Sequence, residues 1–282
     1  MDRRTPALRL VDRGHEGGQV TPSVPAGGCC VGLYELPVVS FLLGPSFHPG
    51  GLETTSRLAQ AALVAPGVRV LDVAAGRGTT AFHLAERFGA VVTGLDASDR
   101  HVEAANATAR ARGLDDRVHF VPGRAGRLPF GAACFDAVVC ECALCTFDDP
   151  DVALAEMARV LVPGGRAAIS DVVLRAPLPP DLQDALARAL CIANALDEAG
   201  YASALTRAGF TAIATTPHDE AVLATIDRIE RRLGALEALG AVPGDATLLS
   251  TPRARATLAS ARAFVRSGGA GYASFVGRRP RR

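Results

Sequence analysis

The chain has 282 residues and a net charge of +1 at pH 7, with 49% hydrophobic and 21% charged residues. This composition excludes a mainly disordered protein, and the small net charge gives no global attraction to nucleic acid or to an acidic membrane. No apolar run reaches the ~20 residues of a membrane helix, and the first 18 residues lack the apolar core of a secretory signal. We therefore expect a cytoplasmic protein with no nucleic-acid and no membrane partner.

The first 66 residues differ in composition from the rest of the chain. Residues 1–28 contain many Gly, Pro and charged residues without periodicity, which predicts a disordered tail. Residues 29–66 contain two short apolar stretches on either side of a loop rich in Gly and Pro, at residues 45–51. The second stretch has helical spacing, so we expect this segment to form a helical cap.

From residue 68 onward, strand patterns and helix patterns alternate. Strands are predicted at residues 68–74, 90–96, 117–123, 135–142 and 166–174, and helices at residues 79–89, 98–113 and 150–161. This order predicts an α/β fold with a doubly wound, mostly parallel, Rossmann-like sheet and helices on both faces. Late strands at residues 210–216 and 272–278, separated by helical segments around 219–238 and 251–266, predict an antiparallel pair at one edge. One domain would thus span residues 67–282.

A helical pattern at residues 181–198 does not belong to this alternation of strands and helices. We expect it to form a helical lid, inserted around residues 177–200 of the domain.

The first strand leads into the sequence LDVAAGRGTT at residues 71–80. Gly76 and Gly78 let the backbone pass close to a ligand, and the N-terminus of the next helix favours a carboxylate or a phosphate. Asp96 ends the second strand, where an acidic residue suits ribose hydroxyls. These features fit NAD or S-adenosylmethionine. Asp72 favours S-adenosylmethionine, because a carboxylate there would repel a pyrophosphate and suits the amino group of a methionine tail.

Three further segments follow in order: LPF at 128–130, FDAVV at 135–139 and RVLVPGG at 159–165. Together with the glycine loop, this set resembles class I S-adenosylmethionine-dependent methyltransferases over roughly residues 67–175.

The resemblance implies roles for individual residues. Gly76 and Gly78 would approach the methionine part of the cofactor, Asp72 would contact its amino group, and Asp96 would bind the ribose. The family usually has Asp where this chain has Arg124, and that Asp contacts the adenine amino group. Arg cannot accept that hydrogen bond, so the adenine contact would come from the backbone at Ala125 or from a different neighbour.

Seven cysteines, an odd number in a chain expected to be cytoplasmic, argue against a disulfide framework. Cys140 and Cys142 end the fourth strand, at the edge where ligands of doubly wound sheets bind. A period of two would place both on one side of the sheet and Glu141 on the other. Cys134 and Cys140 are more typical of core packing, whereas Cys142 is a candidate site residue. A structural zinc site would need a second ligand pair at suitable spacing.

A second resemblance, to the arsenite methyltransferases and their bacterial relatives, runs from about residue 29 to residue 276. It rests on ECALCTF at 141–147, LCIANAL at 190–196, Tyr201 and AGF at 208–210. It implies that Cys142, Cys191 and one of Cys29 and Cys30 are the catalytic residues and hold a trivalent metalloid as substrate. Deprotonated thiols are soft ligands for arsenic, whose lone pair could then attack the methyl group without a base. Glutathione or another thiol reductant is an expected partner.

The leading prediction is thus an S-adenosylmethionine-dependent methyltransferase acting on a thiol-bound metalloid such as arsenite. Two other functions remain open. The acceptor could be a small organic molecule, methylated on O, N, S or C, and His48 is then the candidate base. The chain could also bind S-adenosylmethionine without turnover. Asp72 disfavours a fourth reading, a dehydrogenase. The sequence leaves the natural acceptor and the oligomeric state open.

Overall fold

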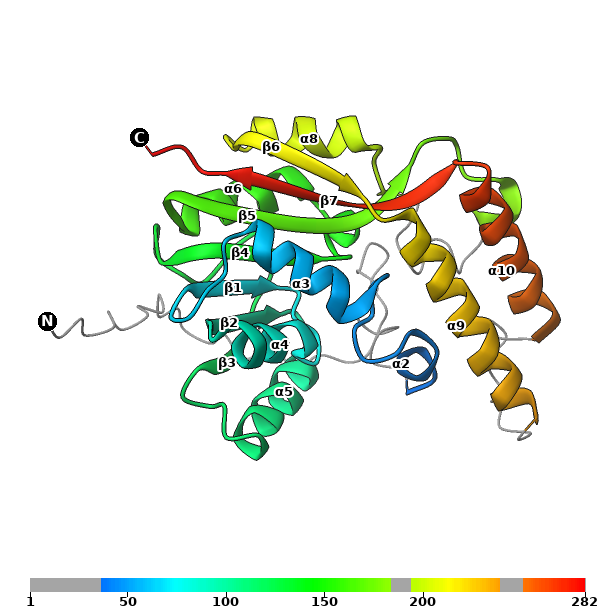
Figure 1. The fold of residues 1–282 in the computed structure, drawn as a ribbon, viewed down its shortest axis with the longest axis horizontal. Coiled ribbons are helices and arrows are strands. Elements are labelled where there is room, and N and C mark those ends of the chain that lie inside the picture. Colours follow the sequence, from blue (N-terminus) through cyan, green and yellow to red (C-terminus); the bar gives the residue numbers. More distant parts are fainter. Residues whose placement is uncertain (1–36, 184–193, 239–250, 282) are drawn as a thin grey trace, which may run out of the picture.

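The computed structural model describes residues 37–183, 194–238 and 251–281, and its centre is a seven-stranded sheet of order β3-β2-β1-β4-β5-β7-β6 (Figure 1). The strands are β1 (Arg69–Val73), β2 (Val91–Asp96), β3 (Val118–Pro122), β4 (Phe135–Glu141), β5 (Leu161–Leu174), β6 (Thr211–Pro217) and β7 (Ala270–Arg278). The first five strands are parallel, and β7 lies antiparallel between β5 and β6. The predicted α/β fold, a doubly wound and mostly parallel Rossmann-like sheet with an antiparallel edge pair, is confirmed.

Helices cover both faces of this sheet (Figure 1). One face carries α3 (Gly51–Ala61), α4 (Thr79–Phe88) and α5 (Asp99–Ala111), and the other carries α6 (Pro150–Val160) and α8 (Glu198–Arg207). The alternation of β1 shows why two apolar layers are needed. Val70 packs against the first set of helices, whereas Leu71 and Val73 pack against the second.

Three more helices pack together beside the sheet, although they come from distant parts of the chain (Figure 1). They are α2 (Pro37–Leu43), α9 (Asp219–Ala238) and α10 (Thr251–Arg266). Leu42, Leu233 and Ala254 form their shared apolar cluster. Arg232 donates a hydrogen bond of 2.6 Å to the carbonyl oxygen of Phe41 and so ties α9 to α2. We call α2, α9 and α10 the three-helix cap.

The lid helix predicted at residues 181–198 differs from the structure at both of its ends, which are the parts that the structure describes. Residues 184–193 lie outside the described residues. On one side of them is a short 3-10 helix (Pro180–Leu182), and on the other α8 begins only at Glu198. Asp197 fixes that start, because its side chain accepts a hydrogen bond of 2.7 Å from the Gly200 amide. The predicted tail at 1–28 also lies outside the described residues.

Strand β5 begins at residue 161, five residues earlier than predicted. The sequence VPGG at 162–165 is typical of a turn. The strand nevertheless continues through these residues, with a shift in its pairing to β4. Gly164 makes this possible with a φ of 86°, and its amide donates to the carbonyl oxygen of Arg279 beyond the end of β7.

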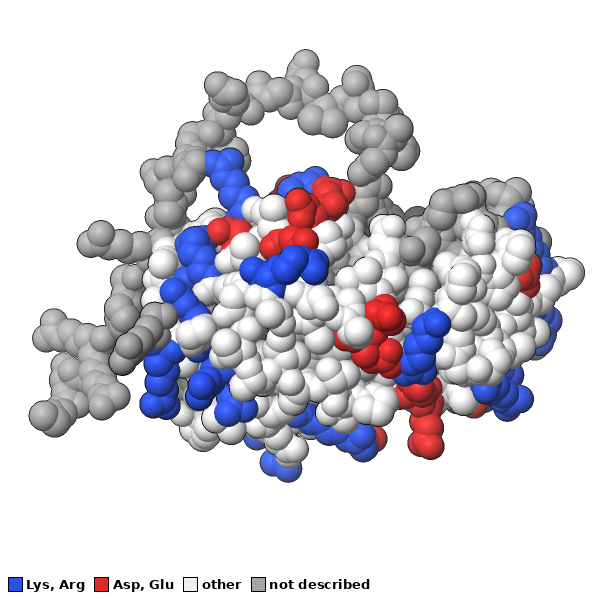
Figure 2. Space-filling model, turned by 90° about the horizontal axis from the view of Figure 1, so that it is seen from above, with Lys and Arg blue, Asp and Glu red and all other residues white. Residues whose placement is uncertain are grey.

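None of the described helices is long and apolar enough to cross a membrane. Viewed from above, the surface carries acidic and basic side chains close together, with basic ones more frequent toward one end (Figure 2). Charges of both signs thus accompany the small net charge of +1.

Candidate active site

A cavity of about 340 Å³ opens at the carboxyl ends of β1, β2 and β4. Its wall includes one acidic residue from the end of each strand: Asp72, Asp96 and Glu141. The position follows from the strand order. The chain moves outward from β1 through β2 to β3 and then returns to place β4 on the other side of β1, and ligands bind where the order reverses in this way.

The loop after β1 turns sharply beneath this cavity. Ala74, Gly76 and Gly78 have φ values of 60°, 53° and 83°, in the left-handed region that favours glycine. A Cβ on Gly78 would lie 2.4 Å from the Phe120 ring, so this position has no room for a side chain. The tight turn lets α4 begin at Thr79, at the cavity wall.

Asp72 is buried in the cavity wall, and its Oδ2 atom has no hydrogen-bond partner among the described residues. Burial raises the pKa of Asp72 well above its usual range, and the carboxylates of Glu141 and Asp96 raise it further. Buried polar atoms are rarely left unpaired. An unpaired carboxylate oxygen at a cavity, with two more carboxylates nearby, suits a cationic group such as the ammonium of a methionine tail.

Asp96 is fixed at the opposite part of the wall by backbone amides. Its Oδ2 accepts a hydrogen bond of 2.7 Å from Gly76, and its Oδ1 accepts one of 2.9 Å from Ser98. The residue is buried but lines the cavity, so its remaining lone pairs can accept from hydroxyl groups. Ala125 and Arg124 also line the cavity, where the resemblance placed the adenine.

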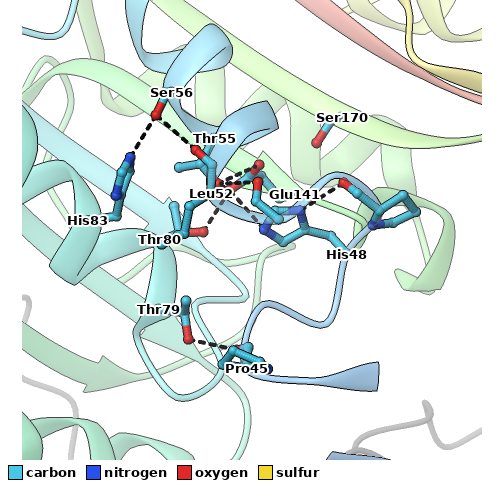
Figure 3. A network of polar contacts seen from close by, with 12 residues as sticks. Pro45, His48, Leu52, Thr55, Ser56, Thr79, Thr80, His83, Glu141 and Ser170 are labelled. Atoms are coloured by element: carbon cyan, nitrogen blue, oxygen red, sulfur yellow. Dashed lines mark hydrogen bonds and ion pairs between the residues drawn. The ribbon is translucent and has the colours of Figure 1, made fainter. Parts of the chain in front are cut away.

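Glu141 is a site residue that the sequence analysis missed (Figure 3). Its carboxylate is 4% exposed and accepts hydrogen bonds from Thr80 Oγ1 at 2.6 Å and from Thr55 Oγ1 at 3.0 Å. The signal was an acidic residue that ends a strand directly after the four apolar residues 137–140. Its partners are 86 and 61 positions away in the chain, so only the fold brings them together.

His48 lies beside this carboxylate, in the loop between α2 and α3 (Figure 3). Its Nδ1 is 3.2 Å from the carbonyl oxygen of Pro49, to which a neutral ring with its hydrogen on Nδ1 would donate. Its Nε2 has no hydrogen-bond partner in the described part of the chain and lies 3.6 Å from Glu141 Oε2. In that tautomer the imidazole is a candidate proton acceptor in the cavity wall.

Of the four thiols predicted to hold a metalloid, the structure describes Cys142, whereas Cys29, Cys30 and Cys191 lie outside the described residues. Cys142 lines the cavity. Burial raises the pKa of its thiol well above the usual range, and Asp171 and Glu141 raise it further. The expected deprotonated thiol is therefore disfavoured at this position.

The expected alternation of side chains at the end of β4 is wrong. The strand ends at Glu141, and Cys142 has a φ of 53°, so the backbone leaves the strand geometry between them. As a result Glu141 and Cys142 both line the cavity, whereas Cys140 is fully buried in the core.

Comparison with known proteins adds to this geometry. A family model described as a methyltransferase domain matches residues 71–169. Methyltransferase GfsG of Streptomyces halstedii is 34% identical over 195 residues, which cover 65% of this chain and 70% of that protein. This chain belongs to the S-adenosylmethionine-dependent methyltransferases. The predicted enzyme class and cofactor are thus confirmed.

Other relatives carry different names. An arsenite methyltransferase of Halobacterium salinarum is 34% identical over 56% of this chain, and the match covers 41% of that protein. Erythromycin 3''-O-methyltransferase of Saccharopolyspora erythraea is 33% identical over 56% of this chain, and the match covers 55% of that protein. The chain thus spans about half the length of these two relatives, which differ in acceptor.

Solved structures show the same fold. The [4+2]-cyclase SpnF has a TM-score of 0.63 and 27% identity, with 81% of each chain covered. Phosphoethanolamine N-methyltransferase 2 of Haemonchus contortus, in complex with S-adenosyl-L-methionine, has a TM-score of 0.71 and 19% identity, with 89% of this chain and 57% of that chain covered.

Proposed function

We propose that this methyltransferase methylates a hydroxyl oxygen of a small organic molecule, with His48 as the general base. The observation that carries the proposal is the imidazole in the cavity wall, whose Nε2 atom has no hydrogen-bond partner among the described residues. A hydroxyl group must lose its proton to become a strong nucleophile, and histidine is the side chain most often used for this.

Different residues would bind the cofactor and accept the proton. Asp72 would bind the ammonium group of the cofactor, and Asp96 would bind its ribose hydroxyls. When bound, S-adenosylmethionine supplies an electrophilic methyl group on a positively charged sulfur, which leaves as a neutral thioether. His48 Nε2 takes the proton of the acceptor hydroxyl. Phe47 and Phe147 line the same cavity and help to exclude water from the reacting oxygen.

The name of one relative supports an oxygen atom as the methyl acceptor. The Saccharopolyspora relative is named as an O-methyltransferase. We take from it the kind of atom that is methylated, and the base at His48 is what gives this chain the means to do so.

Arsenite is a second candidate, favoured by the position of Cys142 in the cavity wall and by the Halobacterium relative. It requires Cys142, Cys191 and one of Cys29 and Cys30 as ligands of the metalloid, with a thiol reductant such as glutathione. The raised pKa of Cys142 weighs against it, although binding of a soft ion would itself displace the thiol proton.

One experiment separates the two acceptors. Transfer of a labelled methyl group is measured with a panel of small hydroxylated organic molecules and, separately, with arsenite plus glutathione. The proposal expects a labelled organic product, a kcat that falls about 10²- to 10⁴-fold in His48→Gln, and little change in Cys142→Ser. Labelled arsenic that is lost in Cys142→Ser and kept in His48→Gln would instead establish the metalloid reaction. Calorimetry with S-adenosylmethionine checks that both variants still bind the cofactor.

A further inference from the structure

Glu141 is a buried carboxylate that the steps above do not use. It ends β4 at the cavity wall, and three different elements approach it: the loop that carries His48, helix α3 with Thr55, and helix α4 with Thr80. Resting on the proposed function, we propose that Glu141 is a positioning residue of the methyl-transfer reaction. It stabilises the imidazolium that forms when Nε2 takes the proton of the acceptor.

The two threonines lock the carboxylate in one place (Figure 3). Thr80 Oγ1 donates to Oε2 at 2.6 Å, and Thr55 Oγ1 lies 3.0 Å from Oε2 and 3.2 Å from Oε1. A hydroxyl has a single proton, and hydrogen bonds donated to a carboxylate favour its ionised form. The hydroxyls thus hold a negative charge at a fixed point beside the ring.

The charge has one potential counter-ion in the described part of the chain. His48 is the only side chain there with a nitrogen within ion-pair distance of Glu141, with Nε2 3.6 Å from Oε2. Both side chains are nearly inaccessible to solvent, at 3% and 4% exposed. A buried carboxylate without a permanent cation is costly. That cost is offset at the moment when His48 becomes positively charged, which is the moment that matters for the reaction.

The proton balance is simple. The proton leaves the acceptor hydroxyl and stays on His48 Nε2, so that the positive charge of the ring lies beside the Glu141 carboxylate. The oxygen keeps the electron pair that forms the new bond to carbon. Glu141 neither gives nor takes a proton in this step, so its effect is electrostatic.

Other titratable groups also interact with Glu141 and must be kept constant in a test. They are Asp72 on β1, His83 on α4, Cys140 on β4, Cys142 after β4 and Tyr272 on β7. The Nε2 atom of His83 lies 2.8 Å from the Ser56 hydroxyl. All five groups remain in a Glu141→Gln variant, which removes only the charge of Glu141.

The first test needs no acceptor. The ring signals of His48 are followed by NMR against pH in the full chain saturated with S-adenosylhomocysteine, and His48→Gln assigns them. We expect the titration midpoint to fall in Glu141→Gln, since loss of a neighbouring negative charge disfavours the charged ring. Thr80→Val, which loosens the carboxylate, should give a smaller fall. Glu86→Gln, an exposed carboxylate on α4, is the matched control and should titrate like the parent. Equal midpoints in the parent and Glu141→Gln would overturn the inference.

The second test is kinetic and uses the hydroxylated organic acceptor that the methyl-transfer measurement identifies. We expect Glu141→Gln to lower kcat about 10-fold or more with little change in the KM for the acceptor, and Glu141→Asp to restore part of the loss. In a His48→Gln background, Glu141→Gln should cause no further loss. If His48→Gln keeps the parent kcat, the proposed function itself is wrong. If His48→Gln loses activity but Glu141→Gln keeps it, only the role of Glu141 is wrong. Thr80→Val serves both tests if Glu141→Gln does not fold.

Discussion

Two buried carboxylates, 69 positions apart in the chain, line the same cavity but differ in their hydrogen bonding. Glu141 accepts hydrogen bonds from two hydroxyls, whereas Asp72 has an Oδ2 atom without a partner in the described residues. The hydrogen bonds to Glu141 favour its ionised form. The Oδ2 atom of Asp72 remains available to a ligand, and burial raises the pKa of this carboxyl well above its usual range.

Replacing Asp72 by Asn should therefore stabilise the ligand-free protein and weaken cofactor binding. The folded pKa of Asp72 lies above its ordinary value of 3.8, so the ionised side chain reduces stability once the pH exceeds about 4. We expect Asp72→Asn to melt at a higher temperature than the parent at pH 7, with the advantage lost near pH 3. The affinity for S-adenosylmethionine should fall roughly 10- to 150-fold, the size of one hydrogen bond to a charged group.

Thermal unfolding at pH 3 and pH 7, together with calorimetric titration, checks both parts. A variant that is less stable than the parent at pH 7 without cofactor would show that Asp72 is a structural residue.

Asp171 offers a second pH-dependent group, away from the cavity. It is fully buried in β5, its Oδ2 accepts a hydrogen bond of 3.0 Å from the Cys145 amide, and burial raises its pKa to about 6. Since 3.8 is its ordinary value, its destabilising effect should grow between about pH 4 and pH 6 and then stay constant. The free energy of unfolding of Asp171→Asn, relative to the parent, should rise by about 3 kcal/mol across this range.

Urea unfolding at half-unit steps from pH 4 to pH 7 measures this difference. The exposed Asp115→Asn is the control, and its difference from the parent should stay nearly constant. A difference for Asp171→Asn that is also independent of pH would contradict the prediction.

At the scale of the elements, the sequence predicted what depends on local pattern. The alternating strands and helices of residues 68–174 and the late antiparallel pair follow from periodicities of 2 and 3.6 residues. The cofactor residues were placed at one site because parallel strands end at one edge. Asp72, Gly76, Asp96 and Ala125 line the cavity, whereas Gly78 is not part of its lining and packs against the Phe120 ring.

What the sequence could not predict depends on single backbone angles or on distant partners. The direction of Cys142 is set by a φ of 53°, which no alternation rule contains. Thr55, Thr80 and Glu141 meet only once α3 and α4 have packed on the sheet. The start of β5 at residue 161 requires its pairing with β4 and β7, since VPGG alone predicts a turn.

The loop after β1 allows backbone strain to be separated from crowding. Gly78 and Gly113 both have positive φ, at 83° and 64°. A Cβ on Gly113 would meet nothing within 4 Å, whereas one on Gly78 would lie 2.4 Å from the Phe120 ring. Gly113→Ala should lower the free energy of unfolding by about 1–2 kcal/mol, the cost of a left-handed residue. Gly78→Ala should cost about 1–3 kcal/mol more, because the added carbon overpacks the core.

Chemical denaturation of the two variants and the parent gives these values. Equal losses at the two glycines would mean that Phe120 moves aside at little cost, and that Gly78 is needed for its backbone angle alone.

At the scale of the whole molecule, the described residues form three separate apolar clusters. Two of them lie on opposite faces of the sheet and join it to its helices. The third lies within the three-helix cap and contains no residue of the sheet. Regions with separate cores can open separately. The cap should therefore unfold at a lower cost than the sheet that carries the cofactor residues.

Leu233 is the residue with which to test this independence, because it is 2% exposed at the centre of the cap cluster. Leu233→Ala should leave a cavity that costs about 2–5 kcal/mol locally. Hydrogen exchange should then speed up in α2, α9 and α10 while the amides of β1 and β4 keep their protection, and the Kd for S-adenosylmethionine should stay within about twofold. The matched change Leu84→Ala, in a fully buried residue of α4, should speed exchange across the sheet instead. If Leu233→Ala exposes the sheet amides to the same degree, then cap and sheet unfold as one unit.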